Sequence, residues 1–293
     1  MRRFLGSFSF LAIVLFAFAV PSRADLILWD TLTPSGALAT TSQGNAAIPS
    51  ETADDFFFLS STAPAFRLDR ITINGLFSNP SAVITNVHVE LYRVFPRDSN
   101  TTRTPVVSRV NGPSDDDFAA FDSTQGSLSF TTRNLGSFAV AQTITPGSAT
   151  QFGAVGPGLT GNLREIDITL TSPIVLFPAA SAIPNDPNHY FLAVTVDTSL
   201  GDYYWVAGQR PPAVFPGSGD LQSWIRTTPF EPDWKRVGEV INPAAPLAST
   251  FNSSFRLRGE IAAVPEPTSM VLLGTGLLGV FGYGLRRRSG NAA

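Results

Sequence analysis

Apolar residues in the middle of the chain, residues 25–262, fall in short runs that clusters of Gly, Pro, Asn, Asp and Ser separate. In the longest run, 83–95, Val87, Val89 and Leu91 alternate with polar residues. A period of two places these apolar side chains on one face of an extended strand. No run keeps the 3.6-residue period of an amphipathic helix. The pattern therefore predicts an all-β domain.

The runs give the positions of the expected strands, because each is rich in β-branched or aromatic residues and is bounded by turn-forming residues. They cover residues 26–29, 55–59, 66–76, 83–95, 106–110, 128–132, 138–144, 166–170, 174–177, 190–196, 203–207, 223–226 and 255–261. In one of them the alternation changes phase near Asp69 and Arg70, which predicts a bulge or bend.

Strands of this length and spacing favour a two-sheet antiparallel sandwich with jelly-roll-like connections. We expect one domain over residues 25–262. The alternative is a division into two domains near 145–162, a Gly-rich segment without a clear strand. One domain is preferred because neither half has enough strands together with a closing strand of its own.

The first 24 residues have the pattern of a secretory signal peptide. Two arginines lie near the start, an almost entirely apolar stretch covers 4–20, and small residues Ser22 and Ala24 stand where a signal peptidase reads. Cleavage by signal peptidase leaves Asp25 as the first residue. The alternative is an N-terminal membrane anchor or a buried helix, but Pro21 breaks the helix just before the small residues and favours cleavage.

The last part of the chain, 263–293, combines a Pro-Glu-Pro tripeptide, an apolar stretch at 270–285 and a cluster of arginines, in that order. The residues that define this set are Pro265, Glu266, Pro267, Arg286, Arg287 and Arg288. Sixteen helical residues span roughly 24 Å, less than the roughly 30 Å hydrocarbon core of a bilayer. Because arginines stay in the cytoplasm, the preceding domain lies outside it. We therefore expect a short transmembrane helix that is inserted only transiently.

This ordered set resembles the PEP-CTERM sorting signal. In Gram-negative bacteria that signal is recognised by an exosortase, a membrane-embedded cysteine protease that removes the tail. The resemblance implies an exported protein that is in the inner membrane as a precursor and then at the outer surface or extracellular. An ordinary tail anchor with an incidental Pro-Glu-Pro is the alternative.

The middle of the chain carries two weaker resemblances. Residues 53–56, 66–71 and 87–92 are similar to a recurrent module of secreted bacterial β-sandwiches. An uncharacterised group of PEP-CTERM proteins is similar at residues 189–191, 203–205, 221–226, 232–234 and 255–260. That group brings no biochemical activity with it, so the resemblance implies architecture and export alone.

Composition excludes several classes of function. The chain has no cysteine, which excludes disulfides, thiolate nucleophiles and Cys-ligated metal centres. It has only two histidines. Its charged fraction is 15%, against about 25% in soluble domains. Six of the 20 basic residues lie in the two terminal segments, so residues 25–285 keep 14 basic and 23 acidic residues, a formal charge of −9. An acidic domain without a basic run is a poor candidate for nucleic acid binding.

Catalytic groups are sparse. Ser218 lies in Gly217-Ser218-Gly219, but the Gly-x-Ser-x-Gly pattern of serine hydrolases is missing. His88 is expected at the surface, and His189 in a capping or buried hydrogen-bonding role. The carboxylates considered for glycoside hydrolysis are Asp54, Asp55, Asp167, Glu231 and Asp233. Adjacent strand residues face opposite sides, so Asp54 and Asp55 are not expected to act together. The sequence therefore predicts a protein that is not an enzyme.

Two further clusters suggest binding. Asp115 and Asp117 follow Asn111-Gly112-Pro113 in an expected loop and are candidate ligands of a structural calcium ion, the alternative being a solvated acidic turn. No other cofactor is expected.

The Tyr- and Trp-rich segment 203–234 offers flat rings that could stack on sugars, with polar groups beside them. Its candidate ligand contacts are Trp224, Arg226, Asp233 and Trp234, whereas packing in the core is the alternative. We expect Trp205 to be core and Trp234 to be exposed.

Three functions follow in order of preference. The first is a non-enzymatic component of the cell surface or extracellular matrix. The second is a carbohydrate-binding module that recognises extracellular polysaccharide, and the third is a secreted hydrolase.

Overall fold

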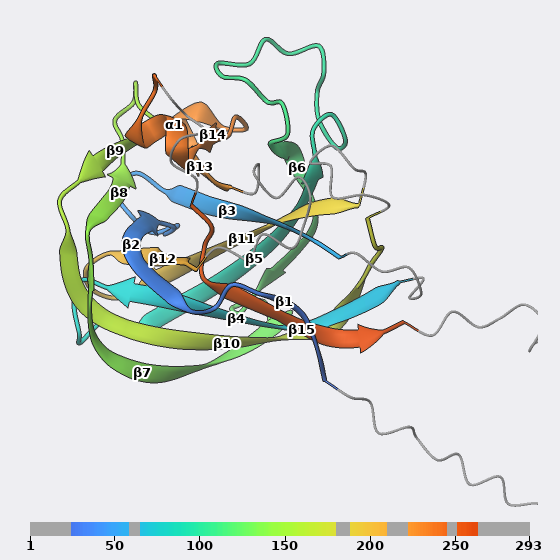
Figure 1. Cartoon of the computed structure of the whole chain (residues 1–293), viewed down its shortest axis with the longest axis horizontal. Coiled ribbons are helices and arrows are strands. Elements are labelled where there is room, and N and C mark those ends of the chain that lie inside the picture. The colour runs from blue at the N-terminus through green and yellow to red at the C-terminus, as the bar shows by residue number, and fades with distance from the viewer. Residues whose placement is uncertain (1–24, 59–64, 180–187, 210–221, 245–250, 263–293) are drawn as a thin grey trace, which may run out of the picture.

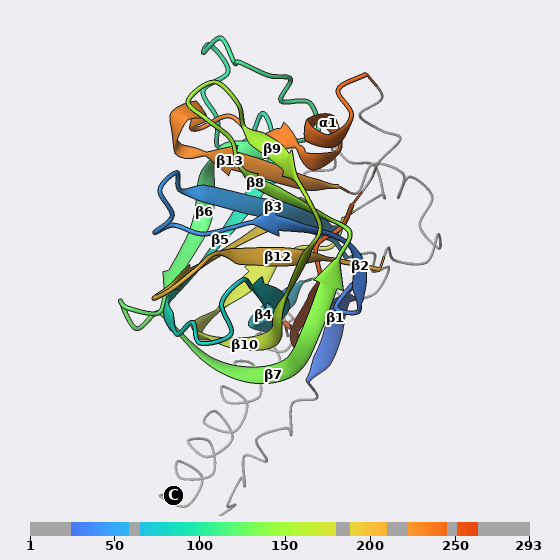
Figure 2. The ribbon, with the colours of Figure 1, turned by 90° about the vertical axis from the view of Figure 1, so that its left-hand side faces the viewer.

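A computed structural model describes residues 25–58, 65–179, 188–209, 222–244 and 251–262, and these form two β-sheets (Figures 1 and 2). The nine-stranded sheet has the order β1-β15-β4-β12-β2-β8-β9, and β10 joins β4 to β7. Its strands are β1 (Leu26–Asp30), β2 (Pro34–Thr41), β4 (Phe66–Phe77), β7 (Leu128–Val140), β8 (Gln142–Pro146), β9 (Gly153–Gly156), β10 (Leu159–Leu176), β12 (Tyr203–Gly208) and β15 (Phe255–Ile261).

The six-stranded sheet has the order β14-β13-β3-β11-β5-β6. Its strands are β3 (Ser50–Phe57), β5 (Ile84–Val94), β6 (Pro113–Asp122), β11 (His189–Thr198), β13 (Ser223–Thr227) and β14 (Lys235–Arg236). Every pairing in both sheets is antiparallel except β2 with β8, which is parallel. The expected mostly antiparallel, two-sheet architecture is confirmed.

The main core lies where the two sheets pack together. On β5 the alternating Val87, Val89 and Leu91 are fully buried, as the sequence pattern predicted. They share one apolar cluster with residues of the nine-stranded sheet such as Ile71 and Ile168. Removing this apolar surface from water is the dominant favourable contribution to folding. The strand alternation therefore specifies which face of each sheet turns inward.

Trp205 belongs to the same core, which confirms the expectation for this residue. Its side chain is 1% exposed, and its indole N–H donates to the carbonyl of Ser254 at 2.9 Å. The ring meets Phe255 edge-on with centroids 5.9 Å apart. A buried indole is tolerated where its N–H finds such a partner.

Several strand predictions were wrong. Residues 106–110 form no strand, and Val106 and Val110 are exposed in the loop between β5 and β6. Conversely, Asp115 and Asp117 were expected in a loop after Asn111-Gly112-Pro113, but both belong to β6. It is an edge strand, and an edge strand has one side open to water, which tolerates polar residues.

The segment 145–162 also differs from expectation, since it contains β9 and the start of β10. Strands from before and after it pair in both sheets: β4 with β10, and β3 with β11 and β13. Strands from both sides of this segment therefore share the two sheets.

Helical structure in the described ranges is limited to the five-residue α1 (Val237–Ile241) and a 3₁₀ turn, Thr228–Phe230. None of the helices in these ranges has the length and apolar character needed to span a membrane. The expected signal peptide, 1–24, and the C-terminal transmembrane helix lie outside the described residues.

Candidate functional site

A polar pocket lies on the outer face of the six-stranded sheet. Because Val87, Val89 and Leu91 of β5 face the core, the residues between them face the other way. The pocket has a volume of about 230 Å³. The lining residues that matter here are Glu51, Asn86, His88, Thr195, Asp122, Asp197, Arg226 and Glu231, which come from five strands and one loop.

Strand register explains why these side chains meet. Thr195 on β11 lies opposite His88 on β5, and His88 lies opposite Asp122 on β6. In the other half of the same sheet, Arg226 on β13 lies opposite Glu51 on β3. Two sets of paired strands, β13 with β3 and β11 with β5 and β6, thus carry most of the hydrogen-bonding groups of the pocket.

Arg226 organises one wall of the pocket. Its Nε and Nη2 donate to Glu51 Oε2 at 3.1 and 2.6 Å, and Nη2 also donates to the Tyr92 hydroxyl at 2.7 Å. The guanidinium lies 4.4 Å from the centre of the Trp234 ring. Such a cation–π contact strengthens when it is shielded from water, and Arg226 is only 8% exposed.

A second carboxylate, Glu90, belongs to the same cluster. Its Oε2 accepts a hydrogen bond from the Tyr92 hydroxyl and lies 3.7 Å from Arg226 Nη2, while Oε1 lies 3.7 Å from His88 Nδ1. Arg226 Nη2 lies 2.6 Å from Glu51 Oε2 and 3.7 Å from Glu90 Oε2, so these two oxygens are at most about 6.3 Å apart. Burial raises the pKa of Glu51, Arg226 opposes this, and the charge of Glu90 adds to the rise.

This arrangement has two chemical readings. Two close carboxylates with different environments are the equipment of a retaining glycosidase, whose carboxyl groups lie about 5–5.5 Å apart. Here, however, one guanidinium contacts both carboxylates, and the Tyr92 hydroxyl holds Glu90. These carboxylates are therefore engaged in contacts within the sheet face.

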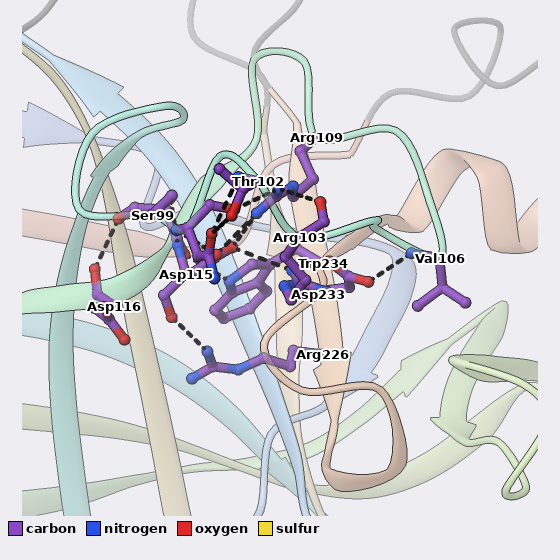
Figure 3. Close-up of polar contacts among 12 residues, drawn as sticks. Ser99, Thr102, Arg103, Val106, Arg109, Asp115, Asp116, Arg226, Asp233 and Trp234 are labelled. Carbon is purple, nitrogen blue, oxygen red and sulfur yellow. Dashed lines mark hydrogen bonds and ion pairs between the residues drawn. The ribbon is translucent and has the colours of Figure 1, made fainter.

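The four residues predicted to contact a ligand do gather on this face, but Trp224, Asp233 and Trp234 are at most 2% exposed. The prediction that Trp234 is exposed was wrong. The loop 95–112, between β5 and β6, lies over it, as Figure 3 shows. Trp234 donates its indole N–H to the carbonyl of Ser114 at 3.2 Å. Its ring face is occupied by Arg226 and is not offered to a sugar.

Asp233 holds the loop 95–112 in place through hydrogen bonds. Its carboxylate accepts hydrogen bonds from the Arg103 guanidinium and from the amide of Val106, the latter at 2.7 Å (Figure 3). The bonds from Arg103 and Val106 outweigh the effect of burial, so the pKa of Asp233 is lowered. This predicted ligand contact is thus an internal one.

The comparisons with known proteins concern the end of the chain. Residues 263–288 match the PEP-CTERM protein-sorting motif. The chain carries this motif at its C-terminus. Such a motif implies an exported, surface-sorted protein that an exosortase processes. No curated protein and no solved structure matches the chain. The motif residues Pro265, Glu266, Pro267 and the three arginines lie outside the described residues, as does Ser218.

Asp115, one of the two calcium ligands that the sequence suggested, is already bound by other groups of the protein. Asp115 is in β6, and its carboxylate accepts from Arg109 Nη1 at 2.7 and 2.8 Å and from the amide of Asn100 at 3.0 Å. Arg103 approaches the same carboxylate at 3.4 Å. The charge of Asp115 is therefore already matched, while Asp117 is exposed. Within the described ranges no group of three acidic or histidine side chains is placed to hold a metal.

The remaining candidates are scattered. His189 is buried, with Nε2 3.5 Å from Asp55 Oδ2, in line with the expected buried role. Asp167 pairs with Arg70 in the other sheet. Asp54 accepts hydrogen bonds from Ser223 and Ser253, contacts that are separate from those of Asp55.

Glu51, Glu90 and Tyr92 were missed by sequence reasoning. The alternation on β5 placed Glu90 on the outer face, but nothing in the sequence shows that β3 and β13 bring Glu51 and Arg226 to the same side.

Proposed function

We propose that this protein is a non-enzymatic component of the cell surface or extracellular matrix of a Gram-negative bacterium. The observation that carries the proposal is the sorting motif at residues 263–288. Signal peptidase removes residues 1–24, the apolar stretch 270–285 is inserted transiently in the inner membrane, and exosortase removes the tail. The remaining sandwich, for which we retain jelly-roll-like connections, reaches the outer surface or the medium.

The pairing of charged groups supports a role without catalysis. Arg226 lies against Glu51 and Glu90, and Asp233 and Asp115 are held by arginines. A general acid or base has to face the substrate with an available proton or lone pair. These groups instead hold the sheet face and its covering loop together.

Turnover assays on a panel of polysaccharides test the absence of catalysis. We expect no release of reducing ends by the purified protein. Release that is lost in both Glu51→Gln and Glu90→Gln, while the control Glu165→Gln on β10 of the other sheet keeps it, would instead assign a hydrolase to the pocket.

Carbohydrate binding is the second candidate, and the polar pocket is the observation that favours it. Its mixed donors and acceptors fit the hydroxyl groups of a sugar, without the aromatic stacking that the sequence suggested. A glycan array with the wild type, His88→Ala and the exposed control Gln125→Ala tests this. We expect His88→Ala alone to weaken binding while its melting temperature stays unchanged. Binding that neither variant alters would place the ligand elsewhere.

A further inference from the structure

The loop 95–112 carries a five-residue segment, Asp98-Ser99-Asn100-Thr101-Thr102, that we call the acceptor segment. An asparagine followed two positions later by serine or threonine, with no proline between them, is the acceptor signal for N-linked glycosylation. Bacterial oligosaccharyltransferases select a longer form of this signal, which has an acidic residue two positions before the asparagine. Asp98 supplies that acid, so the acceptor segment has the complete longer form.

The acceptor segment is accessible from solvent. Asn100 is exposed, and so are Asp98, Thr101 and Thr102 beside it. In both ribbon views the loop projects from the molecule on the side away from the start of β1 (Figures 1 and 2). A bulky, hydrophilic oligosaccharide attached here would extend into solvent and displace no packed side chain.

Hydrogen bonds within the acceptor segment fix which way the Asn100 amide points. The Thr102 amide N–H and hydroxyl donate to Asn100 Oδ1 at 3.0 and 2.8 Å. A backbone N–H can only donate, so the side-chain atom that it contacts has to be the carbonyl oxygen and not the nitrogen. Within the described ranges Asn100 Nδ2 donates no hydrogen bond, so the atom that would bond to a sugar is available.

The main chain of Asn100 is held by buried charged groups beneath the loop (Figure 3). Its N–H donates to Asp115 Oδ2 at 3.0 Å, and its carbonyl accepts from Arg109 Nη2 at 3.0 Å. Arg109 and Asp115 are both buried, whereas the two bonds from Thr102 are local and exposed. An enzyme can therefore open the side-chain contacts without disturbing the sheet, and the folded domain presents the acceptor.

A second asparagine, Asn252, has the short form of the signal and provides an internal comparison. It is followed by Ser253 and Ser254, but Thr250 stands where the longer form requires an acid. Asn252 is 2% exposed, and its Nδ2 donates to Asp54 Oδ1 at 3.3 Å. Its nitrogen is therefore occupied and shielded by the fold. Of the two asparagines, only Asn100 combines the longer signal with an exposed and available amide.

We propose that Asn100 is the attachment site of an N-linked oligosaccharide, which an oligosaccharyltransferase transfers from a lipid pyrophosphate donor on the outer side of the inner membrane. Asn100 Nδ2 forms a bond to C1 of the first sugar and loses a proton. The bond from C1 to the pyrophosphate oxygen breaks, and the lipid pyrophosphate leaves. The proposal rests on export of the domain, which the sorting motif implies.

Mass spectrometry of the protein isolated from the cell envelope and the medium tests the site. Trypsin cleaves after arginine, so it releases Asn100 in the peptide 98–103 and Asn252 in the peptide 237–256. We expect the first peptide to carry whole sugar residues on Asn100 and the second to be unmodified. The intact mass should fall to that of the unmodified mature chain in Asn100→Gln, Asp98→Asn and Thr102→Ala. Thr102→Ser keeps the hydroxyl and should keep the oligosaccharide.

An unmodified peptide 98–103 in a chain that begins at Asp25 overturns the proposal while export stands. Sugar that persists in Asn100→Gln also overturns it, because that sugar would be linked to a hydroxyl group of the same peptide. An unprocessed chain confined to the cytoplasm overturns export and the glycosylation site together, so the two failures are distinguished by the N-terminus of the recovered protein. The wild-type peptide decides the question even where a variant fails to fold.

Discussion

Two buried aspartates, Asp54 on β3 and Asp233 just before β14, differ in the groups that surround their carboxylates. Asp54 accepts hydrogen bonds from Ser223 Oγ at 2.6 Å, Asn252 Nδ2 at 3.3 Å and the amide of Ser253. Asp233 is bound by the Arg103 guanidinium and the Val106 amide. Burial raises the pKa of Asp54 to about 7, since the hydrogen bonds offset it only in part. The pKa of Asp233 is lowered.

The two environments correspond to different structural roles. Around Asp54, neutral donors link β3 and β13 to the chain just before β15, and the carboxyl group takes up a proton near neutral pH. Around Asp233, a full positive charge keeps the carboxylate ionised and ties the loop 95–112 over Trp234. The region around Asp54 joins the two sheets, whereas the region around Asp233 holds the loop 95–112 on the outer face.

Removing the Trp234 ring, which the loop 95–112 covers, should have the largest effect on stability. Trp234→Ala deletes a buried aromatic ring beneath Arg226 and Tyr92. We expect a loss of about 3–5 kcal/mol in the free energy of unfolding, measured by denaturant titration. Val155→Ala, at an exposed site, should change it by less than about 0.5 kcal/mol. Comparable small losses for both variants would mean that the loop does not bury Trp234 in solution.

The protonation of Asp54 should appear as a pH dependence of stability. Its pKa is higher in the folded state than the ordinary 3.8, so the unfolded chain loses this proton first as the pH rises. The contribution is fully present below pH 3.8 and is lost up to about pH 7, at about 1.4 kcal/mol per pH unit. Asp54→Asn should flatten this part of the curve, whereas the exposed control Asp116→Asn should keep it. An unchanged slope in Asp54→Asn would contradict the assignment.

Asp233 should act with the opposite sign. Its folded pKa is lowered, so its stabilisation is present above the unfolded value of 3.8 and is lost as the pH falls through the folded pKa. Asp233→Asn removes the charge that Arg103 and Val106 bind and should cost about 2–3 kcal/mol. Hydrogen exchange should then rise in the loop 95–112 and not around Asp54. Asp117→Asn, at an exposed residue of β6, serves as the control. Unchanged protection of the loop in Asp233→Asn would contradict the role of Asp233 in holding the loop.

The sequence predicted those features that depend on local pattern. The alternation of Val87, Val89 and Leu91 identified the inner face of β5, and Trp205 in its apolar run was recognised as core. The strand β6 was not predicted because its polar residues are tolerated at a sheet edge. Periodicity cannot reveal an edge position, since that position depends on which strands are neighbours.

The pocket depended on contacts that no local pattern contains. Glu51 and Arg226 are 175 positions apart, and only the pairing of β3 with β13 brings them together. Trp234 was expected at the surface because it follows a proline and an aspartate, and a loop from another part of the chain covers it. Residue types suggested polar chemistry around Arg226 and Asp233, but in the fold Arg226 binds Glu51 and Asp233 binds Arg103.

Intact-mass measurement on protein from the cell envelope and from the medium tests the central claim most directly, namely that the chain is exported and processed at both ends. We expect a mature chain that begins at Asp25 and ends near Pro265-Glu266-Pro267. Recovery of the full-length chain alone, from the cytoplasm, would contradict it.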